Sequence, residues 1–158
     1  MIIKESGNLF PMADRLTNNE IDIVFQELNK KLGKYFIKFE LVKPLAYKLT
    51  HGDIDIICCP RVNKFNKLKV YDIIHKHFPN QIIKYVANGN LKSFLFQSSL
   101  GKQCHVDFIT DEKVNYSSVK RYYSYNDFSS LVGILGKKLH FKYSLDGFYK
   151  RYEDSKGR

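Results

Sequence analysis

Two short apolar segments of this chain carry aspartate where a buried strand would carry only apolar side chains. The first is Asp53-Ile54-Asp55-Ile56, and the second is Val106-Asp107-Phe108-Ile109. Successive side chains of a β-strand point to opposite faces of a sheet, so the two aspartates of the first segment share one face while its isoleucines enter the core. The fold must therefore bring two carboxylates together at one place on a sheet.

Two carboxylates held side by side cost charge repulsion and desolvation, which a divalent cation would relieve. Hard oxygen ligands suit Mg²⁺ or Mn²⁺. We therefore predict that Asp53 and Asp55 bind such an ion and act in catalysis, with Asp107 as the third ligand. The alternative is an Asp-x-Asp pair at a strand end or on a solvated face, without a metal. The apolar β-formers beside each acid argue against that alternative.

The charge of the chain indicates its partners. The 158 residues fit a single domain, and a composition of 44% hydrophobic and 27% charged residues is typical of a globular protein. The formal net charge of +10 favours nucleic acid as a partner, because bound cations release counterions from a polyanion. The alternative is a compositional bias toward lysine, with the charge spread for solubility. Without a membrane-spanning apolar run or a signal peptide, we expect a cytoplasmic protein with no membrane partner.

The periodicity of apolar residues predicts an α+β fold with a mixed sheet and helices mainly on one face. Thr17-Asn18-Asn19-Glu20 has the form of a capping box, so a helix is expected over about 18–32. The further elements expected in this core, about residues 17–110, are a strand over 35–42, a short helix over 45–50, the acidic strand over 53–59 ended by Pro60, a helix over 63–78, strands over 82–86 and 91–97 joined at Asn88-Gly89-Asn90, and the strand around Asp107.

Residues 111–158 are predicted to form a helical and basic extension of the same domain. Ser129 or Ser130 would cap a helix that runs through Leu139, and the polar tail beyond Ser144 would fray from Lys150 onward. The three cysteines lie in apolar segments without zinc-finger spacing, so they are expected to be reduced core residues: Cys58, Cys59 and Cys104.

These residues resemble the nucleotidyltransferase superfamily that includes DNA polymerase beta. The pattern of that superfamily is a Gly-Ser loop, then Asp-h-Asp-h, then a strand with h-Asp-h, where h is apolar; the matches are Asp53-Ile54-Asp55-Ile56 and Val106-Asp107-Phe108. The resemblance covers about residues 36–110, and residues 120–149 are faintly similar to the C-terminal part of virus-encoded nucleotidyltransferase-like proteins. It implies transfer of a nucleoside monophosphate from NTP or dNTP to an acceptor hydroxyl, preferably on nucleic acid, with the three aspartates holding Mg²⁺ or Mn²⁺.

The chain departs from the superfamily pattern at Val42-Lys43, which stands where the Gly-Ser that holds the triphosphate is expected. We predict that the ammonium group of Lys43 binds a phosphate instead, at a helix start before Pro44. Lys48 and His51 are predicted as further phosphate contacts, although His51 suits a turn equally well. Alternatively, the pocket has degenerated and the chain is a non-catalytic nucleic-acid-binding or regulatory protein. A third alternative is nucleotidyl transfer to a protein or a small molecule.

Two other groups of residues have weaker signals. Cations and aromatic rings alternate in a segment that we predict to contact nucleic acid by phosphate pairing and base stacking, the alternative being tyrosines packed in a loop: Lys120, Arg121, Tyr122 and Tyr123. His105 shares the strand face of Asp107, either as an outer-shell partner or as an ordinary sheet-surface histidine. The remaining histidines form no metal-ligand constellation and are assigned no role: His75, His77 and His140.

Overall fold

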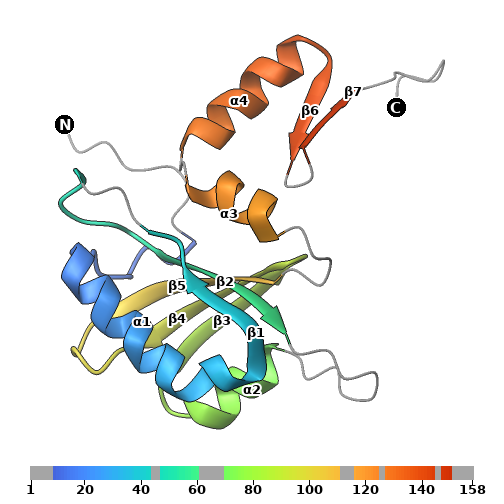
Figure 1. Cartoon of the computed structure of the whole chain (residues 1–158). Coiled ribbons are helices and arrows are strands. Elements are labelled where there is room, and N and C mark those ends of the chain that lie inside the picture. The colour runs from blue at the N-terminus through green and yellow to red at the C-terminus, as the bar shows by residue number, and fades with distance from the viewer. Residues whose placement is uncertain are drawn as a thin grey trace. The chain divides into compact units, whose positions relative to one another are not determined.

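The computed structural model describes residues 9–43, 47–60, 70–110, 116–124, 127–144 and 147–150. The chain divides into two compact units, Met1–Glu112 and Lys113–Arg158. The first unit contains, in chain order, α1 (Asn18–Leu32), a 3-10 turn (Gly33–Tyr35), β1 (Phe36–Leu41), β2 (Ile54–Pro60), α2 (Val70–His77), β3 (Ile82–Asn88), β4 (Leu91–Gln97) and β5 (Gln103–Thr110) (Figure 1). The fold is α+β, as the sequence predicts.

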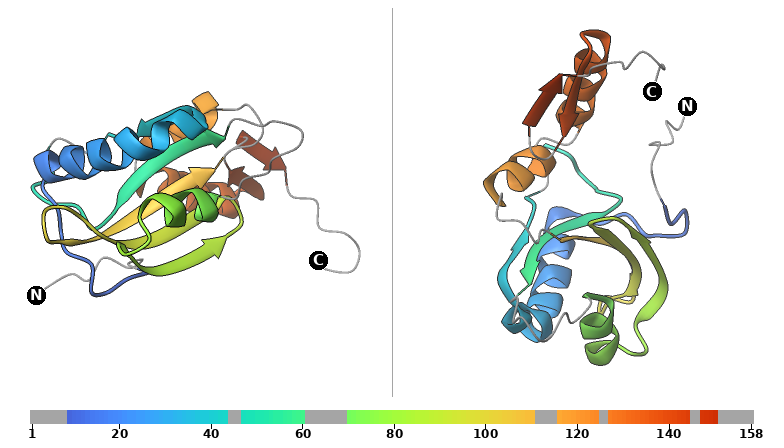
Figure 2. Two further views of the ribbon diagram at one scale, coloured as in Figure 1. Left: turned by 90° about the horizontal axis from the view of Figure 1, so that it is seen from below. Right: turned by 90° about the vertical axis from the view of Figure 1, so that its right-hand side faces the viewer.

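The five strands of the first unit form one mixed sheet in the order β1-β2-β5-β4-β3. The central pair, β2 and β5, is parallel, and every other neighbouring pair is antiparallel. Helices α1 and α2 lie on the same side of this sheet (Figure 2). The sheet therefore has one face covered by helices and a second face on which other side chains can gather.

The core of the first unit lies between the two helices and the sheet. The predicted capping box of α1 is present, with both Thr17 and Glu20 bonded, and the helix buries the side chains of Ile21, Val24, Leu28 and Leu32. These side chains belong to one apolar cluster with α2 and with alternate residues of the central strands: Ile54, Ile56, Cys58, Phe94, Phe96, Cys104, Val106 and Phe108. Because strand residues alternate between faces, Asp55 and Asp107 point to the face opposite the helices.

An N-terminal segment, residues 9–17, crosses the start of β2 and β5. Leu16 and His51 exchange backbone hydrogen bonds of 2.9 and 2.8 Å, and the backbone N–H of Asp14 donates to the carbonyl of Gln103 over 2.8 Å. Phe10 and Leu16 are both buried. No element is predicted for residues 9–16, because pairing between segments so far apart along the chain has no local signal in the sequence.

The helix predicted over 45–50 is wrong in its described part. Residues 47–50 form a turn and a bend, and residues 44–46 lie outside the described part of the chain. The guanidinium of Arg15 donates to the hydroxyl of Thr50 over 2.9 Å and to its carbonyl over 2.7 Å. These contacts, with the backbone bonds between Leu16 and His51, tie the residues around Thr50 to the N-terminal segment. Of the helix predicted over 63–78, α2 covers Val70–His77, and residues 61–69 are not described.

The hairpin predicted around Asn88-Gly89-Asn90 is confirmed. Strands β3 and β4 are antiparallel, and Asn88 pairs with Leu91 across a loop of Gly89 and Asn90. Gly89 has a φ of 55°, the left-handed conformation that a two-residue hairpin loop requires and that glycine adopts without strain.

The second unit contains α3 (Tyr116–Ser124), α4 (Asp127–Lys138), β6 (Phe141–Ser144) and β7 (Gly147–Lys150), the two strands forming an antiparallel hairpin. Of the alternative of tyrosines packed in a loop, the loop is wrong, because α3 spans residues 120–123, whereas Tyr122 does pack against Tyr143. Helix α4 begins two residues before the predicted serine cap, and the Ser129 hydroxyl donates to the Tyr122 carbonyl over 2.6 Å. Lys150, predicted to fray, ends β7, while residues 151–158 lie outside the described part of the chain.

Helix α4 and the turn that follows it leave several large apolar side chains more than half exposed: Phe128, Leu131, Ile134 and Leu135 on the helix, and Leu139 after it. Among the described residues, no helix has both the length and the apolar character that crossing a membrane requires.

Thiol reactivity provides a test of the core. The three cysteines are free, with Cys58 and Cys104 buried and Cys59 partly buried, and burial raises the pKa of the Cys58 and Cys104 thiols. Since the thiolate is the reactive form, we expect Cys58 and Cys104 to react with a thiol reagent at least about 100-fold more slowly in the native protein than in denaturant. Labelling followed by peptide mass spectrometry measures each site, and rapid native labelling of Cys58 would contradict the described core.

Candidate functional site

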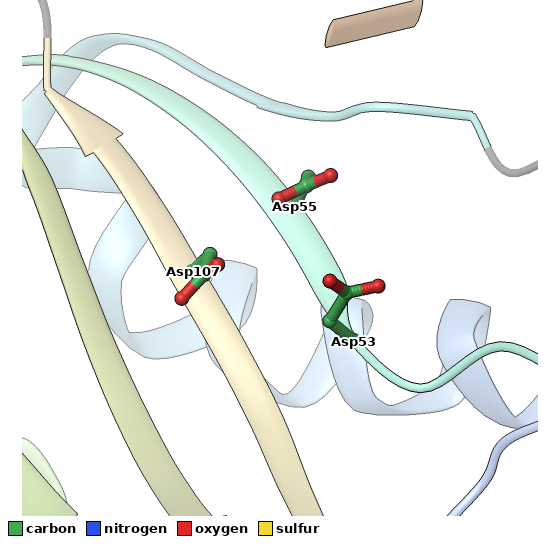
Figure 3. A group of neighbouring side chains, drawn as sticks. All are labelled: Asp53, Asp55 and Asp107. Carbon is green, nitrogen blue, oxygen red and sulfur yellow. The ribbon is translucent and has the colours of Figure 1, made fainter. Parts of the chain in front are cut away.

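Three aspartates lie together on the sheet face opposite α1 and α2. Asp53 directly precedes β2, Asp55 is the second residue of β2, and Asp107 lies in the middle of β5. In the parallel pairing of the two strands, Asp55 is the direct partner of Asp107. One carboxylate oxygen from each residue lies within 4.8 Å of the others. Figure 3 shows the three carboxyl groups on the same side of the two strands.

The three carboxyl groups differ in their exposure to solvent. Asp53 is exposed, Asp55 is partly buried and Asp107 is buried. Burial raises the pKa of Asp55 well above its usual range, and the charges of Asp53 and Asp107 raise it further. Each effect disfavours the charged form of Asp55. The site therefore brings together carboxyl groups whose mutual repulsion opposes ionisation of Asp55.

This donor set fits a divalent cation. Hard cations bind carboxylate oxygens, and the positive charge would offset the repulsion that raises the pKa of Asp55. Because Asp53 is exposed, the site also has a side from which an ion and a larger ligand can approach. The three aspartates can therefore hold a metal ion.

His105 contacts Asp107 directly. Its Nε2 lies 3.0 Å from Oδ1 of Asp107, and both residues are buried. The ring of Phe10, from the N-terminal segment, meets the His105 ring edge-on with the centroids 4.8 Å apart. Of the two alternatives for His105, a partner of Asp107 or an ordinary sheet-surface histidine, the geometry supports the first.

Ser93 is a neighbour of the site that the sequence analysis does not name. It is buried on β4 and is the direct strand partner of Asp107 on the side away from β2. Its position follows from the antiparallel register of β4 and β5.

The predicted phosphate contacts surround the start of β2. The backbone N–H of Val42 donates to the carbonyl of Asp55 over 2.9 Å, so the Val42-Lys43 segment runs beside the acidic strand. Lys43 is exposed and Lys48 is partly buried. His51 is only 5% exposed; burial and then the charge of Lys48 lower its pKa. Within the described part of the chain, Nε2 of His51 has no hydrogen-bond partner.

The predicted nucleic-acid contacts belong to the second unit, whereas the aspartates belong to the first. Lys120 and Arg121 are exposed on α3, while Tyr122 and Tyr123 are partly buried. Tyr122 packs against Tyr143 of β6 with ring centroids 5.5 Å apart. Within α3, Tyr122 therefore has a packing role as well, and the two cations are the more accessible pair.

No known protein-family model matches this chain, and a search of curated proteins finds no similar sequence.

Proposed function

We propose that this chain is a metal-dependent nucleotidyltransferase. It would transfer a nucleoside monophosphate from NTP or dNTP to an acceptor hydroxyl and release pyrophosphate. The observation that carries the proposal is the cluster of Asp53, Asp55 and Asp107, whose carboxylate oxygens lie within 4.8 Å of one another. The order of acidic residues, first Asp-h-Asp-h and then h-Asp-h on a neighbouring strand, supports the resemblance to the nucleotidyltransferase superfamily.

The three aspartates would hold Mg²⁺ or Mn²⁺, which when bound lowers the pKa of the acceptor hydroxyl and offsets the charge of the triphosphate. The chain supplies the positions of the ligands. Asp55 and Asp107 stand at paired positions of two central strands, a rigid base for the site. Asp53 lies at the exposed side, where substrate would enter. Lys43, which follows the residue bonded to the Asp55 carbonyl, would bind a phosphate through its ammonium group.

Nucleic acid is the favoured acceptor because positive charge gathers in the second unit. Residues 113–158 contain ten Lys and Arg against four Asp and Glu, a net charge of +6 out of +10 for the whole chain. Residues 1–112, which are more than twice as many, contribute the other +4. A concentration of cations beside aromatic residues suits a phosphate backbone with stackable bases. Lys120 and Arg121 on α3 are the first candidates for these contacts.

A second candidate function is nucleic-acid binding or regulation without catalysis. The observation that favours it is Val42-Lys43, which lacks the small residue and the hydroxyl of the Gly-Ser pattern beside the acidic strand. In that case the aspartates would bind a metal weakly or not at all, and nucleic-acid binding would not depend on them. Transfer to a protein or a small molecule remains a third candidate.

The test is calorimetric titration of the full chain with Mg²⁺ or Mn²⁺ and each NTP and dNTP. We expect metal-dependent nucleotide binding that Asp53→Asn weakens at least about tenfold, because one ligand is lost from an exposed position that the fold does not need. Asp22→Asn is the matched control, because Asp22 is an exposed acid on α1, against the other face of the sheet. It should bind as the unaltered chain does.

Turnover with labelled nucleotide and DNA, RNA or protein acceptors then distinguishes the enzyme candidates. Label transferred to nucleic acid would support the favoured acceptor, and label transferred only to protein would support the third candidate. Absence of nucleotide binding by the unaltered chain at millimolar ligand would contradict the proposal and favour the non-catalytic candidate.

A further inference from the structure

We propose that His105 is a positioning residue that orients the carboxylate of Asp107 in the metal centre. This inference rests on the proposed function, since it concerns the same three aspartates. Its basis is the buried contact of 3.0 Å between Nε2 of His105 and Oδ1 of Asp107. The two residues are separated by one position on β5, so their side chains emerge on the same face of the sheet.

A carboxylate held at one oxygen loses the freedom to rotate about its terminal bond. When Nε2–H of His105 donates to Oδ1, it fixes the plane of the Asp107 carboxylate and the directions in which its remaining lone pairs point. Metal ligands that are oriented by such a hydrogen bond bind their ion more tightly, because less order has to be gained on binding. Asp107 needs this support more than Asp53 does, because it must be held relative to its strand partner Asp55.

The His105 ring is itself held by its surroundings. Phe10 packs edge-on against it at an interplanar angle of 79°, and Phe10 is 4% exposed. Across the sheet, His105 is the strand partner of Leu95 on β4, which is fully buried. The segment that carries Phe10 is fastened by the hydrogen bond from the Asp14 backbone to the Gln103 carbonyl. A chain of contacts thus runs from the N-terminal segment through His105 to Asp107.

The competing explanation is that His105 only fills space in the core. Two variants separate the explanations, because both keep a polar amide but place its N–H₂ group differently. The longer side chain in His105→Gln can place its amide nitrogen near the position of Nε2, where it donates to Asp107. The shorter side chain in His105→Asn places its nitrogen near Nδ1 instead and cannot reach Oδ1 from the same backbone.

The experiment is a titration of the full chain with Mn²⁺ alone, with free Mn²⁺ measured by electron paramagnetic resonance. We expect His105→Gln to bind Mn²⁺ within about threefold of the unaltered chain and His105→Asn to bind it about 10- to 100-fold more weakly. His77→Gln is the matched control, because His77 also has a side-chain partner, the Tyr35 hydroxyl at 2.7 Å, but lies at the end of α2. It should leave Mn²⁺ affinity unchanged. Thermal unfolding of each metal-free variant monitors the fold.

Equal Mn²⁺ affinity for His105→Gln and His105→Asn, together with binding by the unaltered chain, would overturn the role of His105 and leave the metal centre standing. Absence of Mn²⁺ binding by the unaltered chain would overturn the metal centre and the role of His105 together. If His105→Asn does not fold, Phe10→Leu tests the same chain of contacts, because it frees the His105 ring without removing the hydrogen-bond donor. It should weaken Mn²⁺ binding by about two- to fivefold, and an unchanged affinity would overturn the inference.

Discussion

Replacing Asp55 by asparagine is expected to abolish metal-dependent nucleotide transfer while making the metal-free protein more stable. The fold disfavours the charged form of Asp55, because burial and the charges of Asp53 and Asp107 raise its pKa well above the usual range. The amide keeps the shape of the side chain and removes the charge. We expect turnover to fall by at least about 10³-fold and the free energy of unfolding of the metal-free protein to rise by about 1–3 kcal/mol at pH 7.

The pH dependence of this stabilisation has a definite sign. Because the pKa of Asp55 is higher in the folded than in the unfolded chain, the folded chain holds the Asp55 proton more tightly. The unaltered metal-free protein therefore loses stability as the pH rises from the ordinary aspartate range, near about pH 4, through the raised pKa. The Asp55→Asn variant has no carboxyl group at this position, so it does not lose stability with rising pH in this way. The difference in unfolding free energy between the two proteins should be small near pH 4 and should grow as the pH rises, since groups that do not interact with Asp55 contribute equally to both proteins.

Urea unfolding in the presence of a chelator measures the difference at each pH. Saturating Mn²⁺ should reverse the order, because the metal stabilises only the chain that binds it. If the asparagine variant were less stable than the unaltered chain at pH 7 in the chelator, the charge of Asp55 would be satisfied within the protein, and the case for a cation would fail.

Removing the ring of Phe108 should have the largest effect on stability. Phe108 is 1% exposed and follows Asp107 on β5, on the face toward the helices. Its ring meets the edge of Phe94 with the centroids 5.4 Å apart and lies 6.1 Å from the ring of Phe39. Phe108→Ala would leave a cavity between the central strands and the helices, and we expect a loss of about 3–5 kcal/mol in the free energy of unfolding.

Chemical denaturation measures this loss, and Ile37→Ala provides the comparison. Ile37 is 65% exposed on β1, an edge strand, so its truncation should change stability by no more than about 0.5 kcal/mol. A loss below about 1 kcal/mol for Phe108→Ala would mean that the space closes around the missing ring, contrary to the packed core described above.

The elements that the sequence predicts correctly have signals that lie within the element. The capping box at Thr17 and Glu20 and the helical spacing of Ile21, Val24 and Leu28 define α1 without reference to the rest of the chain. Asn88-Gly89-Asn90 likewise defines its hairpin. The helix predicted over 45–50 is wrong in its described part, residues 47–50, where Arg15, thirty-five residues away along the chain, bonds the carbonyl and hydroxyl of Thr50. Such a distant contact has no local signal in the sequence. The hairpin of β6 and β7 is missed because its strands are only four residues long.

In the candidate site, too, some features have a local sequence signal and others depend on distant parts of the chain. Alternation along a strand is sufficient to place Asp53 and Asp55 on one face. The apolar residues around Asp107 and the resemblance to a known superfamily both indicate it as the third ligand. Its pairing with Asp55, however, depends on the parallel register of two strands far apart in the sequence. The surroundings of His105 could not be predicted, since they depend on where the segment around Phe10 folds back.

The position of β5 makes assembly of the centre a late event during synthesis. The strand order places β5 between β2 and β4, although β5 is the last of the five strands in the chain. Until it emerges from the ribosome, β1 with β2 and β3 with β4 can form two separate hairpin-like pairs, each with an unsatisfied edge open to other chains. When β5 pairs with β2 on one side and with β4 on the other, it covers the open edges of these two strands. The same step places Asp107 beside Asp55. A nascent chain that lacks β5 therefore has both open strand edges and an incomplete group of carboxylates.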